Sequence, residues 1–250
     1  MGSHHTTFGT FPKNLKNSDG CGSLHRVHSN LAQTKLVSGA LEIHKTTEAE
    51  LKKNNEKLRK ILSATIQAMA RTVEVRDPYT AGHQRRVTEL ACAIGVEMGL
   101  SGDQMDAIRT AGAIHDIGMI SVPAEILSKT GKLTEIEFSM IKSHPQVGYE
   151  ILKDIDFPWD VARIVLQHHE RTDGSGYPQA LKGVDILLES RIIALADVVE
   201  AMASHRPYRP ALGIDRALEE ISRNKGGLYD PEVEDVCIRI FRQKGFRFKE

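Results

Sequence analysis

Hydrophobic residues between positions 48 and 75 recur at the spacing of an amphipathic helix. Apolar side chains follow one another at intervals of 7, 4, 4, 3 and 4 residues, at Leu51, Leu58, Leu62, Ile66, Met69 and Val73. This spacing places them on one helix face, and neither glycine nor proline interrupts the segment. The pattern predicts a helix over residues 48–75.

The preceding residues show little periodicity and are rich in glycine, serine, asparagine and threonine. The opening MGSHH is typical of an expression tag, so His4 and His5 are not counted among the candidate metal ligands. We interpret residues 1–47 as a tag remnant with loop or the edge of an upstream region, and we expect residues 1–40 to be loop.

After Pro78 the helical period continues in shorter segments that turns separate. Apolar residues from Val87 to Met98 form one helix face, and Ser101 can cap the next helix. Thr134 and Glu137 fit a capping box. Further helices fit residues 159–170, 188–204, 215–224 and 231–243. No segment alternates with period two, so we predict an all-α domain of about seven helices over residues 76–250.

Charge and cysteine content narrow the classes of function. The 33 basic and 33 acidic residues balance, which gives no general attraction to a nucleic-acid polymer or to an anionic membrane. The three cysteines lack CxxC spacing, which is typical of a reducing compartment rather than of a disulfide framework. No apolar run approaches the ~18 residues of a membrane span. We expect this segment to be cytoplasmic.

Imidazoles and carboxylates recur along the predicted domain about once per helical hairpin. Seven such residues are His83, His115, Asp116, His144, His168, His169 and Asp197. Side chains spaced in this way can converge inside a helical bundle. Asp197 stands in the apolar stretch RIIALADVVEAMA, where a buried carboxylate is costly unless it is paired or bound to a cation. Seven ligands exceed the need of one tetrahedral ion, so we predict two divalent metals sharing a carboxylate, iron or manganese rather than structural zinc.

Four segments resemble, in order and spacing, the HD-GYP domain, a subgroup of the HD metal phosphohydrolases. They are RDPYTAGHQRRV (76–87), HDIG (115–118), HHERTDGSGYP (168–178) and LADVVEAMASHRPYR (195–209). The resemblance covers about residues 74–245. It implies an HD-type helical bundle and a bacterial phosphodiesterase that hydrolyses cyclic di-GMP to pGpG, and in some members onward to GMP.

The resemblance also implies roles for the seven residues. One metal is implied at His83, His115, Asp116 and Asp197. Asp116, the implied catalytic carboxylate, bridges to a second metal at His144, His168 and His169. A water activated by both cations is the expected nucleophile, so the reaction needs no nucleophile from the protein.

Substrate contacts are implied at Tyr177, Arg206 and Arg209, and Arg86 is a further candidate from its position. Tyr177 lies in GSGYP (174–178), which on composition alone is a turn. Arg206 and Arg209 flank a rigid Pro-Tyr step, and their forked guanidinium groups suit phosphate or guanine edges. Arg86, one turn beyond His83, can face either the pocket or solvent.

Two positions depart from the family pattern. Met119 stands where the second motif commonly ends in lysine, and the missing charge is expected to weaken turnover rather than folding. Tyr79 stands where some relatives carry a glutamate and bind a third metal, so we expect two metals.

Alternative interpretations stay open at this point. Met119 favours a low-turnover sensor of cyclic di-GMP, and the same motifs fit an HD hydrolase of another cyclic dinucleotide. The segment GALEIHKTTEAELKKNNEKLRKIL (39–62) resembles the end of a PAS-type sensor entering a signalling helix. The helix over residues 48–75 therefore either packs on the domain or forms a homodimer that carries a signal from an upstream sensor domain or partner.

Overall fold

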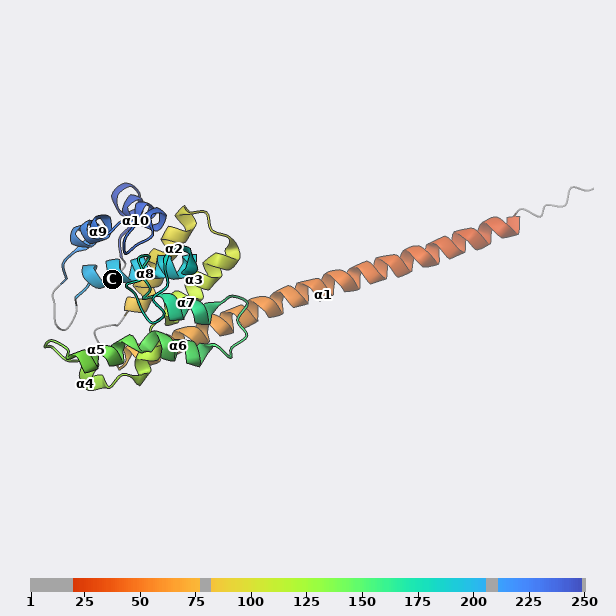
Figure 1. Cartoon of the computed structure of the whole chain (residues 1–250). Helices are drawn as coiled ribbons and strands as arrows, with labels where there is room; N and C mark the ends of the chain where they lie inside the picture. The colour runs from red at the N-terminus through yellow and green to blue at the C-terminus, as the bar shows by residue number, and fades with distance from the viewer. Residues whose placement is uncertain (1–19, 77–81, 206–210, 249–250) are drawn as a thin grey trace, which may run out of the picture. The chain divides into compact units, whose positions relative to one another are not determined.

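A computed structural model describes residues 20–76, 82–205 and 211–248, with side chains described from residue 35 onward (Figure 1). The chain divides into two compact units, Met1–Arg59 and Lys60–Glu250. Within the described residues no helix combines the length and the apolar character needed to cross a membrane.

The longest helix, α1, begins at Gly20 and ends at Glu74, so it includes nearly all of the helix predicted over residues 48–75. The expectation of loop before residue 40 is wrong from Gly20 onward, and residues 1–19 lie outside the described part of the chain. The physical reason is that no proline occurs between Gly20 and Glu74. Serine, threonine and asparagine each cost a helix less than about 1 kcal/mol, which neighbouring leucines and lysines can offset.

The apolar stripe of α1 is divided between solvent and the interior. In the first unit, every described side chain from Lys35 to Arg59 is exposed, including Leu51 (65%) and Leu58 (66%). In the second unit, Ile66 and Val73 are buried in the hydrophobic core. The packing interpretation therefore holds for the C-terminal part of the stripe, whereas the leucines before Lys60 lack a partner among the described residues.

The second unit is built from short α-helices, as predicted. They are α2 (His83–Glu97), α3 (Gly102–Ile114), α4 (Ala124–Leu127), α5 (Glu135–Lys142), α6 (His144–Leu152), α7 (Val161–Gln167), α8 (Leu188–Ala203), α9 (Ile214–Arg223) and α10 (Pro231–Gln243), with 3-10 turns η2 (Ile117–Ser121) and η3 (Gly183–Asp185). Among the described residues β structure is limited to an isolated bridge between Lys225 and Tyr229. The all-α fold class is confirmed. The count exceeds the expected seven because α4 is a single turn and α6 follows α5 directly.

Local sequence signals set several of these helix ends. Ser101 and Thr134 each accept a hydrogen bond from the backbone at the third helical position, and both form complete capping boxes. The box at Thr134 and the cap at Ser101 were predicted, and the reciprocal contact of Gln104 at Ser101 was not. Asp160 and Asp230 accept backbone hydrogen bonds at the starts of α7 and α10. These caps satisfy amide groups that have no partner inside the helix.

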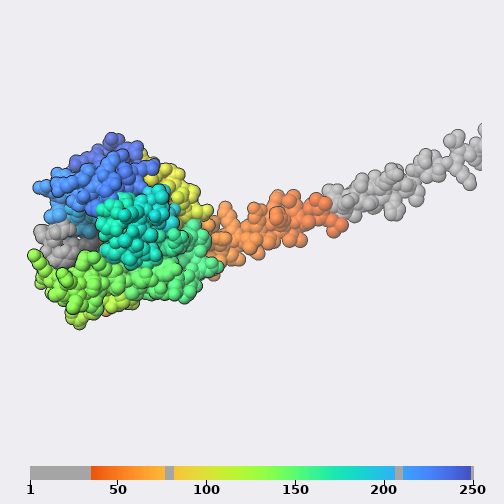
Figure 2. Space-filling view, in the orientation of Figure 1, coloured from red at the N-terminus to blue at the C-terminus, as the bar shows by residue number. Residues whose placement is uncertain are grey.

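The core of the second unit surrounds α8, which packs against α2, α3, α7, α9 and α10 (Figure 1). Its stretch from Ile192 to Ala196 is buried throughout. Leu90 and Ile94 of α2 and Ile108 of α3 are fully buried in the same cluster. Figure 2 shows the segment near residue 175, in teal, against the blue C-terminal region, where the backbone nitrogen of Thr172 donates to the carbonyl of Leu228. Asp197 follows directly on the buried stretch from Ile192 to Ala196 of α8.

Candidate metal centre

The seven predicted ligands come from different helices but converge on one region of the second unit. His83 and His144 begin α2 and α6, His115 and Asp116 follow α3, His168 and His169 follow α7, and Asp197 lies within α8. Their ligand atoms form three overlapping groups, each within 4.8 Å: His144, His168 and His169; His83, His115 and Asp197; and His115, Asp116 and His168. The structure thus brings together all seven residues that sequence spacing selected.

Three of the imidazoles are oriented by the backbone in the same way. The Nδ1 atom of each lies close to the carbonyl oxygen three residues earlier, at 2.8 Å for His115, 2.7 Å for His144 and 2.6 Å for His168. A carbonyl oxygen can only accept, so each Nδ1 must carry the proton. The Nε2 lone pair of each ring therefore faces the cluster, as a metal ligand requires.

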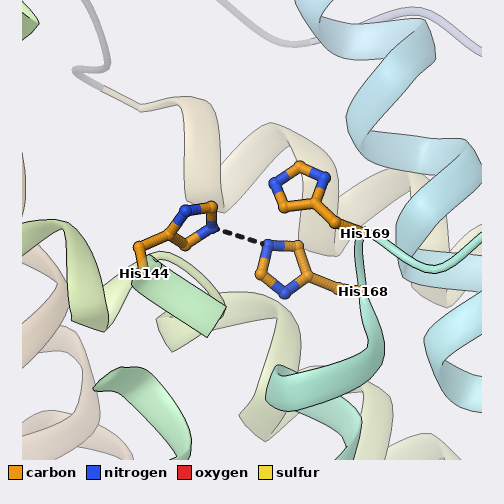
Figure 3. Close-up of side chains that lie close together, drawn as sticks. All are labelled: His144, His168 and His169. Carbon is orange, nitrogen blue, oxygen red and sulfur yellow. Dashed lines mark hydrogen bonds between the residues drawn. The ribbon is translucent and has the colours of Figure 1, made fainter. Parts of the chain in front are cut away.

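His144, His168 and His169 form one half of the site (Figure 3). The Nε2 atoms of His144 and His168 are 3.1 Å apart. Two lone pairs at that distance repel unless a cation lies beside them. Nitrogens bound at right angles to one ion, at about 2.1 Å each, are separated by about 3 Å, so the spacing fits a shared metal.

His83, His115 and Asp197 form the other half. The Nε2 atom of His83 is 3.2 Å from Oδ1 of Asp197. The Nε2 atom of His115 is buried without a hydrogen-bond partner among the described atoms. A buried nitrogen of this kind is destabilising unless something binds it, so it supports a cation in this half of the site.

Asp116 lies between the two halves, and its two oxygens face different ways. Its Oδ2 atom is 3.4 Å from Nε2 of His115 and 3.7 Å from Nε2 of His83. Its Oδ1 atom is 3.4 Å from Nε2 of His144. This is the arrangement that a carboxylate shared by two cations requires.

Burial and charge set the protonation of the cluster. Burial and neighbouring imidazoles hold the pKa values of His168 and His169 well below the usual range. For Asp116, burial alone would raise the pKa, but the nearby His115, His144 and His83 outweigh it and lower the pKa to about 2. For His83, burial alone would lower the pKa, but the hydrogen bonds to Asp197 and Glu200 outweigh it and raise the pKa to about 9. The neutral imidazoles of His168 and His169 can therefore bind a cation without first releasing protons, whereas His83 gives up a proton when a cation binds.

Tyr177 lies at the edge of this cluster. Its ring stacks on that of His169 with centroids 4.8 Å apart, and its backbone nitrogen donates to the carbonyl of His169 at 3.2 Å. Glu170, which is buried, holds the following loop because it accepts from the backbone nitrogens of Gln179 at 2.7 Å and Leu181 at 3.0 Å. The GSGYP turn is therefore fixed beside the predicted metal ligands.

Of the three arginines predicted to contact substrate, the structure describes Arg86. Arg86 is paired with Glu200, because its Nε and Nη2 atoms each lie 2.7 Å from Oε1 of that carboxylate. Arg206 and Arg209 lie outside the described residues, as does Tyr79. Met119 packs against the hydrophobic core.

Sequence reasoning missed Glu200, which the structure places in contact with the cluster. One of its carboxylate oxygens, Oε2, accepts a hydrogen bond from Nδ1 of His83. Glu200 stands three residues after Asp197 in the same apolar stretch. The argument that singled out Asp197, a charged group in an apolar helix, applies equally to Glu200.

The chain is similar in sequence to known proteins. The HD domain family model matches residues 67–233. The chain is 39% identical over 218 residues to the cyclic di-GMP phosphodiesterase response regulator RpfG of Xanthomonas campestris pv. campestris, covering 84% of this chain and 57% of the relative. It is 37% identical over 171 residues to the 3'3'-cGAMP-specific phosphodiesterase 3 of Vibrio cholerae, covering 68% of this chain and 37% of the relative. The chain thus spans about half, or less, of these relatives.

A solved structure shares the fold. The HD domain of the Listeria monocytogenes phosphodiesterase PgpH, in complex with cyclic di-AMP, aligns with a TM-score of 0.51 and 21% identity, covering 73% of this chain and 99% of that one. At that identity the likeness shows the fold alone. The family match covers well over half of the chain. The chain therefore belongs to the HD domain family, and its resemblance to the HD-GYP subgroup is confirmed.

Proposed function

We propose that this chain is a metal-dependent phosphodiesterase that hydrolyses cyclic di-GMP to pGpG in bacterial signalling. The observation that carries the proposal is the position of Asp116, with one oxygen toward His115 and the other toward His144. A shared carboxylate between two sets of imidazoles suits cleavage of a phosphate ester. The name of the relative from Xanthomonas supplies the substrate class.

Two ions, iron or manganese, are proposed at this site. The first is held by His83, His115 and Asp197, the second by His144, His168 and His169, and both by Asp116. When bound, such a pair lowers the pKa of water and stabilises charge on the attacking and leaving oxygens. The mixture of nitrogen and oxygen ligands favours octahedral ions.

The residues around the cations orient the substrate in this proposal. Asp116 and Asp197 balance the positive charge of the ions, and the Tyr177 ring, stacked on His169, offers an apolar face beside the site. An aromatic face of this kind can stack on a nucleotide base. Arg206 and Arg209 are proposed to bind phosphate or guanine edges from the segment that follows α8.

A different cyclic dinucleotide is the second candidate substrate. The relative from Vibrio is specific for 3'3'-cGAMP, and its identity to this chain, 37%, is close to the 39% of the cyclic di-GMP relative. Overall identity therefore does not separate the two substrates. Both carry phosphodiesters that would reach the same metal pair.

Purified protein loaded with Mn²⁺ or Fe²⁺ should be incubated separately with cyclic di-GMP and 3'3'-cGAMP, and the products separated by chromatography. We expect pGpG from cyclic di-GMP at the higher rate. The Asp116→Asn variant, which keeps the shape and removes the charge, should give no product above background. Binding of cyclic di-GMP without product, in protein that holds two metal ions, would refute the enzymatic proposal and favour a sensor.

The helix preceding the domain is proposed to mediate a parallel homodimer that conveys a signal from an upstream sensor. Leu51 and Leu58, which are exposed, are the side chains that such a pairing would cover. Their replacement by glutamate in the full chain should convert the dimer to a monomer by light scattering. A wild-type chain that is monomeric would refute this part. The three cysteines lack CxxC spacing, which favours a cytoplasmic location for the proposed phosphodiesterase and its signalling helix.

A further inference from the structure

Glu200 is a fully buried carboxylate on α8, and the described residues His83, Arg86 and Ser204 donate hydrogen bonds to it. Its side chain is 0% exposed. The Oε2 atom accepts from Nδ1 of His83, while Oε1 accepts from Nε of Arg86 at 2.7 Å and from the hydroxyl of Ser204 at 2.7 Å. A carboxylate buried this deeply is tolerated only when it is paired and hydrogen-bonded. Both of its oxygens are therefore engaged.

The contact between Glu200 and His83 is a difference between the two halves of the metal centre. The imidazoles of His115, His144 and His168 are oriented by backbone carbonyls, which substitution of a side chain does not remove. His83 is oriented by the carboxylate of Glu200, 117 residues away in sequence. Among the four imidazoles whose Nδ1 partner the structure describes, His83 is the one held by a side chain, and it lies in the half formed with His115 and Asp197.

We propose that Glu200 is a positioning residue for this half of the centre, and thereby sets the affinity of one metal ion and not of the other. Its Oε2 atom accepts the Nδ1 proton of His83, which leaves Nε2 facing Asp197 and Asp116. The guanidinium of Arg86 binds the other oxygen of this carboxylate, Oε1, and so helps to hold Glu200 in place. The inference rests on the proposed two-metal site but involves no substrate.

The carboxylate has two effects on His83 as a ligand. It holds the ring in the tautomer and orientation that expose Nε2, and it makes that nitrogen a stronger donor to the metal. In Glu200→Gln, the amide group can instead donate to Nδ1, which moves the ring proton to Nε2, where the ion would bind. Loss of such an outer partner weakens metal binding by about 10–100-fold. The ion at His144, His168 and His169 should keep its affinity.

The test measures metal alone. Wild type and Glu200→Gln are titrated with Mn²⁺ against a chelator, and bound metal per chain is read by elemental analysis. Electron paramagnetic resonance distinguishes a spin-coupled ion pair from a single Mn²⁺. We expect two equivalents in wild type, and in Glu200→Gln one equivalent of wild-type affinity, a second weakened 10–100-fold, and the signal of a single ion at limiting metal.

The matched control is Glu234→Gln. Glu234 is also a buried glutamate, 1% exposed, but it lies on α10, and no hydrogen bond or ion pair among the described residues joins it to the seven ligands. The Glu234→Gln variant should bind two ions, as wild type does. If circular dichroism shows that Glu200→Gln does not fold, the same measurement is made on Glu200→Asp. This variant keeps the negative charge but moves the carboxylate away from His83 by the length of one methylene group. An intermediate loss confined to one ion is then expected.

Unchanged binding of both ions in the folded Glu200 variant would overturn the inference, and so would equal weakening of both, which indicates general destabilisation. The proposed function fails separately, through absence of hydrolysis by wild-type protein that holds both ions. In that event the selective loss of one ion in Glu200→Gln would still support the positioning role.

Discussion

Replacement of Gly118 by alanine should damage the site more than the fold. Gly118 lies in η2, two residues after Asp116, where this turn packs on α6. A Cβ atom at this position would lie 1.9 Å from the carbonyl oxygen of His144 and 2.7 Å from the backbone nitrogen of Gly148. Both are backbone atoms, so no side-chain rotation relieves the contact.

The distances give the size of the effect. The 1.9 Å separation must open to at least 3.0 Å, so η2 and α6 must move apart by about 1 Å. Overpacking of this kind costs about 1–3 kcal/mol, which lowers Tm by about 2–12 °C in a domain of this size. The same movement separates Asp116 from His144. A displacement of about 1 Å at a catalytic group can cost about 100-fold in rate.

The assay compares Gly118→Ala with Gly131→Ala, because a Cβ on Gly131 meets nothing within 4 Å. We expect the Gly131 variant to match wild type in Tm, Mn²⁺ content and turnover of cyclic di-GMP. The Gly118 variant should remain folded at 20 °C, bind Mn²⁺ more weakly and lose about 100-fold in kcat/KM. Wild-type metal binding and turnover in Gly118→Ala would refute the claim that this backbone contact sets the spacing of Asp116 and His144.

Three further predictions concern single groups. Tyr177→Ala should lower kcat/KM about 2- to 12-fold, whereas Tyr177→Phe retains the ring that stacks on His169. The hydrogen bond from Lys129 lowers the pKa of Glu137 to about 2 from an ordinary 4.5. The contribution of ionised Glu137 to the free energy of unfolding is therefore complete above pH 4.5 and is lost as the pH falls toward 2. The difference in urea midpoint between wild type and Glu137→Gln should therefore shrink below pH 4.5. Burial raises the pKa of the Cys237 thiol to about 12, so iodoacetamide at pH 8 should label its peptide only after unfolding, as mass spectrometry would show.

Helix boundaries were predictable where the chain marks them with chemically distinct residues. The predicted helix over residues 231–243 matches α10, whose start is marked by Asp230 as a cap and by Pro231 in the first turn. The capping box at Thr134 likewise sets the start of α5. Side-chain caps and first-turn prolines act within a few residues of chain, so their effect does not depend on tertiary contacts.

The same local reasoning failed where two helices share a boundary. Ser143 ends α5 and precedes α6, so no loop separates them. Pro145, which taken alone indicates a turn, instead occupies the first turn of α6, where its missing N–H has no role in helix hydrogen bonding. The direction of α6 is fixed by burial of Leu152 and by the close packing on η2. That is a tertiary effect, which periodicity within one segment cannot indicate.

The candidate ligands were predictable because imidazoles and carboxylates in apolar helices have few other uses, and their spacing by whole hairpins limits where they can meet. What orients them was not predictable. The partner of His83 lies 117 residues away, and nothing in the spacing of Glu200 distinguishes a carboxylate that holds a ligand from one that is a ligand. Asp197 and Glu200 stand three residues apart on one helix, but one faces Nε2 of His83 and the other Nδ1. Composition can select both residues, but only the rotation of α8 against α2 decides which of them takes each part.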